Sequence, residues 1–192
     1  MYRFNDNLIK NTFSNLTQDY ILNQLYDDSR TIQGFLTNAT LSPNSSYHFH
    51  SLDKFNRGDI LTLDNSYYMI TGDIVNDRVS KYKGIADYCN FSQPMKAIEK
   101  VMIGTDSLGR PIYQNKEVDK GTEYGILRYK DISIQDGNAI NFANPIYTLY
   151  VRDIQKNRDY FTINKEITVE DKTLTVYNLV YAKQGLLEIR LQ

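Results

Sequence analysis

Cysteine, histidine and tryptophan are nearly absent from this sequence, which restricts the chemistry it can carry. Cys89 is the only cysteine, so the chain has no internal disulfide and no cysteine-rich metal site. The only two histidines, His48 and His50, would share one face of a strand, but only Asp53 nearby could complete a zinc site with them. We therefore expect two solvent-exposed loop histidines and no bound metal.

A charge excess and a long apolar run are missing as well. The formal net charge of -1 gives the chain as a whole no electrostatic attraction to nucleic acid. No stretch approaches the roughly 18 apolar residues of a membrane span, and residues 1–7 lack the apolar core of a signal peptide. We expect a soluble protein, made and used in a cytoplasm, with no membrane partner.

Common catalytic motifs are absent too. The sequence has no G-x-S-x-G elbow, no G-x-x-x-x-G-K-[ST] loop and no H-E-x-x-H helix. Residues 104–110 have the glycine spacing of a phosphate loop, but Arg110 and Pro111 stand where lysine and serine or threonine are needed. Cys89 has no histidine close in sequence, so we expect a small core residue rather than a nucleophile. The sequence predicts a protein that is not an enzyme and has no cofactor.

The first forty residues carry a helical pattern. Apolar side chains recur there at spacings of one to five residues, at Leu16, Tyr20, Ile21, Leu25 and Tyr26. The pattern predicts an amphipathic helix from Leu16 to Gln33 that ends at Gly34. Residues 37–46 are rich in Asn, Ser and Thr, which indicates a loop or extended arm. We expect residues 1–54 to form an N-terminal arm with one helix.

From Phe55 onward the apolar period changes to two, as in β-strands. Residues 60–63 and 67–71 flank the turn Asp64-Asn65-Ser66, which predicts a β-hairpin. Residues 81–91 return as another strand. Three or four strands with short turns suggest a small SH3-like barrel.

Further strands are expected in the C-terminal half, between residues 121 and 192. Asp136-Gly137 is the dipeptide favoured in a two-residue hairpin turn. We therefore expect a mostly β fold, a small barrel or sandwich built from hairpins, over residues 55–192. It would comprise two hairpin-built subunits, residues 55–103 and 124–192.

One pattern occurs twice in this region at a constant offset of 106 residues. Phe55, residues 61–63, Asp64-Asn65, Tyr68 and Ile70 align with Phe161, residues 167–169, Glu170-Asp171, Leu174 and Val176. Each copy is an aromatic residue, a strand, an acidic turn and a returning strand. Two interpretations stay open: a duplicated unit, or the similarity that any two short hairpins share.

The clearest local charge cluster is Arg78, Lys81 and Lys83, interleaved with Tyr82. On a strand, Lys81 and Lys83 share one face and Tyr82 lies on the other. The cluster could contact DNA phosphate or an acidic partner, or form a solvated strand face. Together with Arg110, these residues are our candidates for interface or lumen contacts.

Three short segments resemble a family of structural proteins of tailed bacteriophages. They are Arg57 to Ile70, Asn76-Asp77-Arg78, and Lys81 to Ile85 followed by Cys89-Asn90; residues 125–192 fit more loosely. The family comprises head-closure, or stopper, proteins and neighbouring head–tail connector proteins. The resemblance brings no catalytic residues with it.

What the resemblance implies is a β-barrel subunit of a ring under the portal, which retains packaged DNA and docks the tail. The implied partners are further copies of the chain, portal or adaptor proteins and tail proteins, with non-specific contact to DNA. The implied location is the virion, after assembly in the host bacterial cytoplasm. Ring subunits bind one another through unlike surfaces that close when the rotation permits.

Other functions remain as alternatives. A tail-completion or baseplate component would differ only in the neighbour it contacts. A small β-barrel module that binds sugar or nucleic acid would need a concave tyrosine patch and affinity as a monomer. An enzyme is disfavoured, because the sequence lacks a convergent acid–base set.

Overall fold

The described part of the chain is almost entirely β-strand, as the sequence predicts. The computed structural model describes residues 11, 13–25, 28–38, 46–77, 81–130, 146–169 and 171–192. The elements are β1 (Gln18–Asn23), β2 (Arg30–Asn38), β3 (Ser46–Ser51), β4 (Ile60–Leu63), β5 (Ser66–Ile70), β6 (Val75–Asp77), β7 (Lys81–Tyr88), β8 (Phe91–Thr105), β9 (Pro111–Lys130), β10 (Ile146–Arg152), α2 (Gln155–Tyr160), β11 (Glu166–Val169), β12 (Lys172–Lys183) and β13 (Leu186–Leu191). No helix in these residues is long and apolar enough to cross a membrane.

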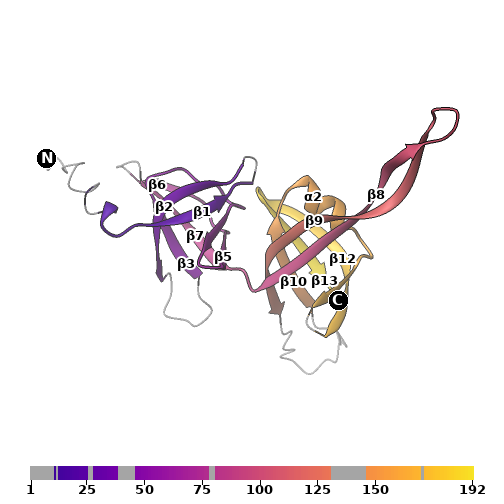
Figure 1. Cartoon of the computed structure of the whole chain (residues 1–192). Coiled ribbons are helices and arrows are strands. Elements are labelled where there is room, and N and C mark those ends of the chain that lie inside the picture. Colours follow the sequence, from indigo (N-terminus) through magenta and orange to yellow (C-terminus); the bar gives the residue numbers. More distant parts are fainter. Residues whose placement is uncertain are drawn as a thin grey trace, which may run out of the picture.

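Strands β1 to β5 and β7 form a closed six-stranded barrel, and the short β6 pairs with β7 (Figure 1). Its strands are hydrogen-bonded in the order β3-β2-β1-β4-β5-β7, and β3 also pairs with β7, so the sheet closes on itself. The barrel interior contains Tyr20, Leu22, Ile32, Phe49, Phe55, Leu61, Ile70 and Ala86. The barrel is therefore larger than the one predicted from residues 55–91, because β1, β2 and β3 are part of it.

The predicted helix from Leu16 to Gln33 is wrong, since β1 and β2 form an antiparallel pair there. Tyr20 faces Ile32 across this pair and both are buried, whereas the neighbouring Ile21 is exposed. Buried and exposed side chains thus alternate along β1, which is the period of two that a strand shows. It overrides the helical spacing because β1 also pairs with the distant strand β4. Residues 18–51 therefore belong to the barrel and not to the predicted N-terminal arm.

The hairpin predicted after Phe55 is confirmed by β4 and β5, which are joined by Asp64 and Asn65 with positive φ angles. Gly58 precedes β4 in a turn with a φ of 89°. The buried Asp59 side chain then accepts two backbone hydrogen bonds, one of them from the N–H of Leu25 at 2.8 Å. The segment Arg57 to Asp59 is thus a structural turn.

Strands β8 to β13 form a second sheet, in the order β11-β12-β13-β10-β9-β8. This sheet is open, because β11 and β8 lie at its two edges. It curves around a core of its own, to which Met95, Leu149, Phe161 and Ile189 contribute. The predicted turn at Asp136-Gly137 lies outside the described residues.

The two units repeat one topology, strand for strand. With the short β6, which has no counterpart, left out of the numbering, the strand order in each unit is first, second, third, sixth, fifth, fourth: β1-β2-β3-β7-β5-β4 and β8-β9-β10-β13-β12-β11. The described pairings in both units are antiparallel. The two similar hairpin sequences therefore lie in units that share a topology of six strands, which is more than two unrelated hairpins share.

The two units also share an individual backbone hydrogen bond at equivalent positions. The N–H of Gly58 donates to the carbonyl oxygen of Ile70 at 2.8 Å, and the N–H of Asn164 donates to that of Val176 at 2.8 Å. Both members of the second pair lie 106 residues after those of the first. Gly58 and Asn164 also share a positive φ, 89° and 67°. The same turn therefore precedes β4 and β11.

A close backbone approach is repeated on β2 and β9. A Cβ atom on Gly34 or Gly125 would lie 2.6 Å or 2.8 Å, respectively, from a carbonyl oxygen of the neighbouring strand. Only glycine fits so close to another backbone. Gly34 faces Gln18 of β1, and Gly125 faces Phe91 of β8. These pairs align β1 with β8 residue by residue.

The units differ where the first strand ends. Ile21 of β1 faces Thr62 of β4 and closes the first barrel. By the alignment above, Pro94 of β8 occupies the position of Ile21, and the pairing of β8 with β9 shifts between Pro94 and Lys96. Proline has no N–H to donate to another strand. The shift sets two residues of β9, Lys120 and Gly121, opposite Met95 alone, so β9 carries a bulge that bends the hairpin here. In the described residues β8 accordingly does not pair with β11.

Beyond this point β8 and β9 continue as a projecting hairpin, residues 96–122, which we call the arm (Figure 1). Its strands pair as far as Thr105 and Pro111, a reach of about 30 Å at roughly 3.3 Å per residue. A turn joins the two strands at the tip, where the Asp106 carboxylate accepts the backbone N–H of Arg110 at 2.8 Å. No residue of the arm is buried.

Candidate functional site

The two units meet at a small apolar cluster. It consists of Ile60, Met69, Cys89, Ile126 and Leu186. Beside it, the ring of Tyr67 on β5 stacks on that of Tyr124 on β9, with centroids 3.6 Å apart. Cys89 is confirmed as a core residue, and burial raises the pKa of its thiol to about 12. A thiol that stays protonated is a poor nucleophile.

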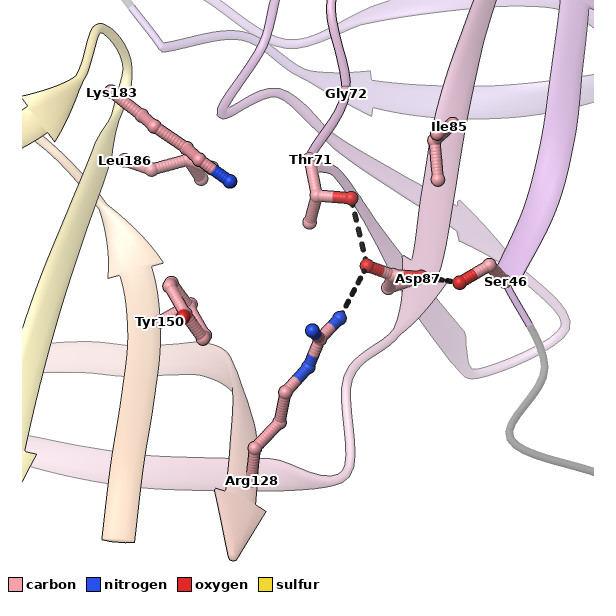
Figure 2. A pocket seen from close by; sticks show the side chains of 9 residues that line it. All are labelled: Ser46, Thr71, Gly72, Ile85, Asp87, Arg128, Tyr150, Lys183 and Leu186. Carbon is pink, nitrogen blue, oxygen red and sulfur yellow. Dashed lines mark hydrogen bonds and ion pairs between the residues drawn. The ribbon is translucent and has the colours of Figure 1, made fainter. Parts of the chain in front are cut away.

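Asp87 on β7 is the polar centre of this junction. It is buried, and its carboxylate accepts the hydroxyls of Ser46 at 2.5 Å and Thr71 at 2.7 Å. Arg128 of β9 donates to the same carboxylate at 3.0 Å, which links the two units (Figure 2). With three donors on its oxygens, Asp87 is a structural acceptor rather than a free base.

A cavity of about 260 Å³ opens beside Asp87, between the units (Figure 2). Arg128 and Tyr150 line it from the second sheet, and the guanidinium lies 5.5 Å from the Tyr150 ring centroid. Lys183 reaches into the cavity from β12 toward Thr71. Within the described residues its ammonium has no acidic partner.

These groups suit the binding of an anion better than catalysis. Two cationic side chains face the cavity, and only Arg128 is neutralised by Asp87. Lys183 thus leaves one positive charge, with the Thr71 hydroxyl nearby. Such N–H and O–H donors bind carboxylate or phosphate oxygens through charge-assisted hydrogen bonds. Ser46, whose hydroxyl is donated to Asp87, has no histidine in the cavity lining to activate it.

Besides Asp87 and Arg128, a second and more deeply buried ion pair joins Glu123 of β9 to Arg152 of β10. Glu123 is 0% exposed, and Arg152 donates two hydrogen bonds to its carboxylate, each at 2.8 Å. The Lys156 ammonium lies 3.9 Å from the same group. By the alignment of the units, Glu123 stands where the first barrel has the buried Ile32. Sequence reasoning missed this pair because its members are 29 residues apart.

The residues predicted as interface or lumen contacts are not gathered in one place. Lys81, Tyr82 and Lys83 follow one another on β7, where Tyr82 packs against the first core and Lys81 lies over aromatic rings. Arg110 is exposed at the tip of the arm. Arg78 lies outside the described residues. Their role as contacts stays a prediction.

The expectation of two exposed loop histidines is wrong, because β3 lies between β2 and β7. His50 is buried, stacks on Phe35 with ring centroids 4.8 Å apart, and has its Nε2 3.1 Å from the Thr37 hydroxyl. Burial, and then the charges of two lysines on β7, lower its pKa to about 4. The described residues contain no cluster of three metal-ligating side chains around this histidine or elsewhere.

Comparisons with protein-family models, with curated proteins and with solved structures give no match. The function is therefore argued from two features of the chain itself. One is the cationic cavity at the junction, and the other is the exposed arm of the second unit.

Proposed function

We propose that this protein is a non-enzymatic structural subunit that assembles through its arm. The arm is a two-stranded ribbon, and such a ribbon is at best marginally stable in water unless something packs against it. Because no residue of the arm is buried, the rest of the described chain supplies little of that packing. A protein partner would supply the rest.

The apolar face of the arm carries this proposal. Met102 and Tyr113 face each other across the two strands, and Ile98 lies four residues before Met102, on the same face. The exposed fractions of Ile98, Met102 and Tyr113 are 76%, 53% and 58%. Leu108 extends the apolar surface at the tip. Methionine and aromatic residues are enriched at protein interfaces, and a contiguous exposed apolar patch marks such a site.

The specific form of the proposal is a ring in the head–tail connector of a tailed phage, which closes the head and docks the tail. Its support is the resemblance over residues 57–90, together with a closed barrel joined to a second unit that bears a projecting arm. The partners would be neighbouring copies, portal or adaptor proteins and tail proteins, and the location would be the virion. Arg110 at the tip of the arm could touch packaged DNA. A tail-completion or baseplate component would use the same arm on a different neighbour.

Two variants on adjacent residues test the role of the arm. Tyr113→Asp places a charge on the apolar face, whereas Gln114→Asp places the same charge on the opposite face. We expect Tyr113→Asp to weaken self-association, and binding to the portal and tail proteins encoded beside it, by about tenfold or more. Gln114→Asp should bind like the wild type.

Mass photometry measures the assemblies, and circular dichroism checks that each variant keeps its β signal. A wild-type chain that stays monomeric and binds neither portal nor tail proteins would overturn the connector. Equal effects of the two variants would contradict a role for the apolar face.

The cavity with Lys183 favours a second candidate function, a module that binds an anionic ligand. Calorimetric titration with inorganic phosphate tests it, since Lys183→Ser should abolish the binding. Undetectable binding by the wild type at millimolar phosphate would rule this candidate out.

A further inference from the structure

The second unit has an open sheet edge that the first unit closes. We propose that this edge, strand β11, pairs with the arm strand β8 of a second copy of the chain. The inference rests on the proposed arm-mediated assembly and adds the surface that receives the arm.

The first barrel provides the precedent for this pairing. There, β4 accepts β1, with Leu22 facing Leu61 and Ile21 facing Thr62. Strand β11 is the counterpart of β4, and Thr168, at the offset of 106 residues, is the counterpart of Thr62. Strand β8 is the counterpart of β1. The first barrel thus shows that the edge corresponding to β11 can accept an antiparallel strand, while the segment of β8 that we propose to fill it, residues 97–105, lies beyond the part that aligns with β1.

The chain cannot form this pair with its own β8. Pro94 stands at the position from which Ile21 meets β4, and proline offers no N–H to a neighbouring strand. Opposite Met95, the bulge at Lys120 and Gly121 of β9 then bends the hairpin into the arm, which projects away from the sheet (Figure 1). The β11 edge is therefore left without a strand partner among the described residues.

The side chains of strand β11 alternate between buried and exposed, as in a regular sheet strand, although the strand is paired on one side only. Ile167 and Val169 point into the core and are buried, while Glu166 and Thr168 are exposed. The hairpin partner β12 occupies one side of β11. The backbone N–H and C=O groups on the other side need either water or another strand.

The arm strand β8 has the matching free edge. Between residues 97 and 105 it pairs with β9 on one side, and the described residues place no strand on its other side. Because β1 runs antiparallel to β4, we expect the incoming β8 to run antiparallel to β11. Main-chain hydrogen bonds would then supply affinity, as in other cases of strand addition to a sheet edge.

Donor and acceptor are different surfaces of the same chain, so the contact is head-to-tail. Contacts of this kind form closed rings when the rotation between copies closes, and filaments when it does not. A ring therefore requires no symmetric dimer interface. The reach of the arm, about 30 Å, carries β8 beyond its own subunit.

Two substitutions at one position of β11 test the edge. Thr168→Pro removes a backbone N–H, whereas Thr168→Val keeps it. We expect Thr168→Pro to raise the protein concentration at half-assembly by about tenfold and Thr168→Val to leave it unchanged. If Thr168→Pro assembles like the wild type although Tyr113→Asp does not, the arm assembles the protein but β11 does not receive it.

Cross-linking decides the matter if Thr168→Pro does not fold. Chains with Thr168→Cys are mixed with chains carrying Glu99→Cys or Val101→Cys on β8 and treated with a short bifunctional thiol reagent. Because Cys89 is buried with a pKa of about 12, the introduced thiols are the reactive ones. We expect a mixed dimer on non-reducing gels, and none when Lys183→Cys replaces Thr168→Cys. Assembled chains without the mixed dimer would overturn the inference.

Discussion

Replacing Arg152 with methionine is expected to destabilise the protein by about 3 kcal/mol. The substitution leaves the carboxylate of Glu123 fully buried without the two 2.8 Å hydrogen bonds that it accepts from the guanidinium. Removing one partner of a buried ion pair costs about 3 to 5 kcal/mol. We expect the lower end, because the ammonium of Lys156, 3.9 Å away, can move toward the carboxylate and offset part of the loss.

Urea unfolding followed by circular dichroism measures this change, and a second variant tests its cause. The double substitution Glu123→Ile with Arg152→Met should recover the wild-type free energy of unfolding to within about 1 kcal/mol. The reason is the equivalent position of the first unit, where Ile32 is buried in the same setting. A loss below about 1 kcal/mol for Arg152→Met, or a double variant no more stable than that single variant, would refute the reasoning.

Three further predictions concern the junction and the barrel. As the pH falls from about 7.5 to 5, the free energy of unfolding should decrease by about 2 kcal/mol because of His50. In the unfolded chain this histidine takes up a proton below about pH 6.5, whereas in the folded protein it does so only near pH 4. His50→Gln should remove this part of the pH dependence, and parallel curves for the two proteins would contradict it. Cys89 should react with Ellman's reagent only after denaturation; rapid reaction of the folded protein would contradict its burial. Asp87→Asn should lower stability by about 1 to 3 kcal/mol in the same urea assay, since Arg128 then lacks its carboxylate; a change below about 0.5 kcal/mol would contradict its place as the polar centre.

Local signals in the sequence identify the hairpin of β4 and β5 correctly. Residues 60–71 alternate between apolar and polar positions around Asp64 and Asn65, and both features act within a few residues. The helix predicted over residues 16–33 is wrong because the apolar spacing there fits a helix as well as a strand. What decides between the two is the pairing of β1 with β4, about 40 residues further along the chain.

Sequence reasoning finds little of the junction, because its contacts are long-range. Asp87 and Arg128 are 41 residues apart, and neither stands in a motif. The repeat of residues 55–70 at residues 161–176 is a usable signal, but it covers only part of each unit. Outside this repeat, the difference in residue number between equivalent positions of the two units changes from strand to strand, mainly because the arm is inserted in the second unit. The glycines Gly34 and Gly125, each held against a neighbouring backbone, are the marks that recover the full alignment.

Strand β9 gives the molecule a mechanical continuity. It extends as one strand, with a bulge at Lys120 and Gly121, from Pro111 at the tip of the arm to Lys130 at the junction. On the way it carries Tyr124, which stacks on the first barrel, and Arg128, which grips Asp87. A pull or a twist applied to the arm therefore reaches the first barrel along a single hydrogen-bonded strand.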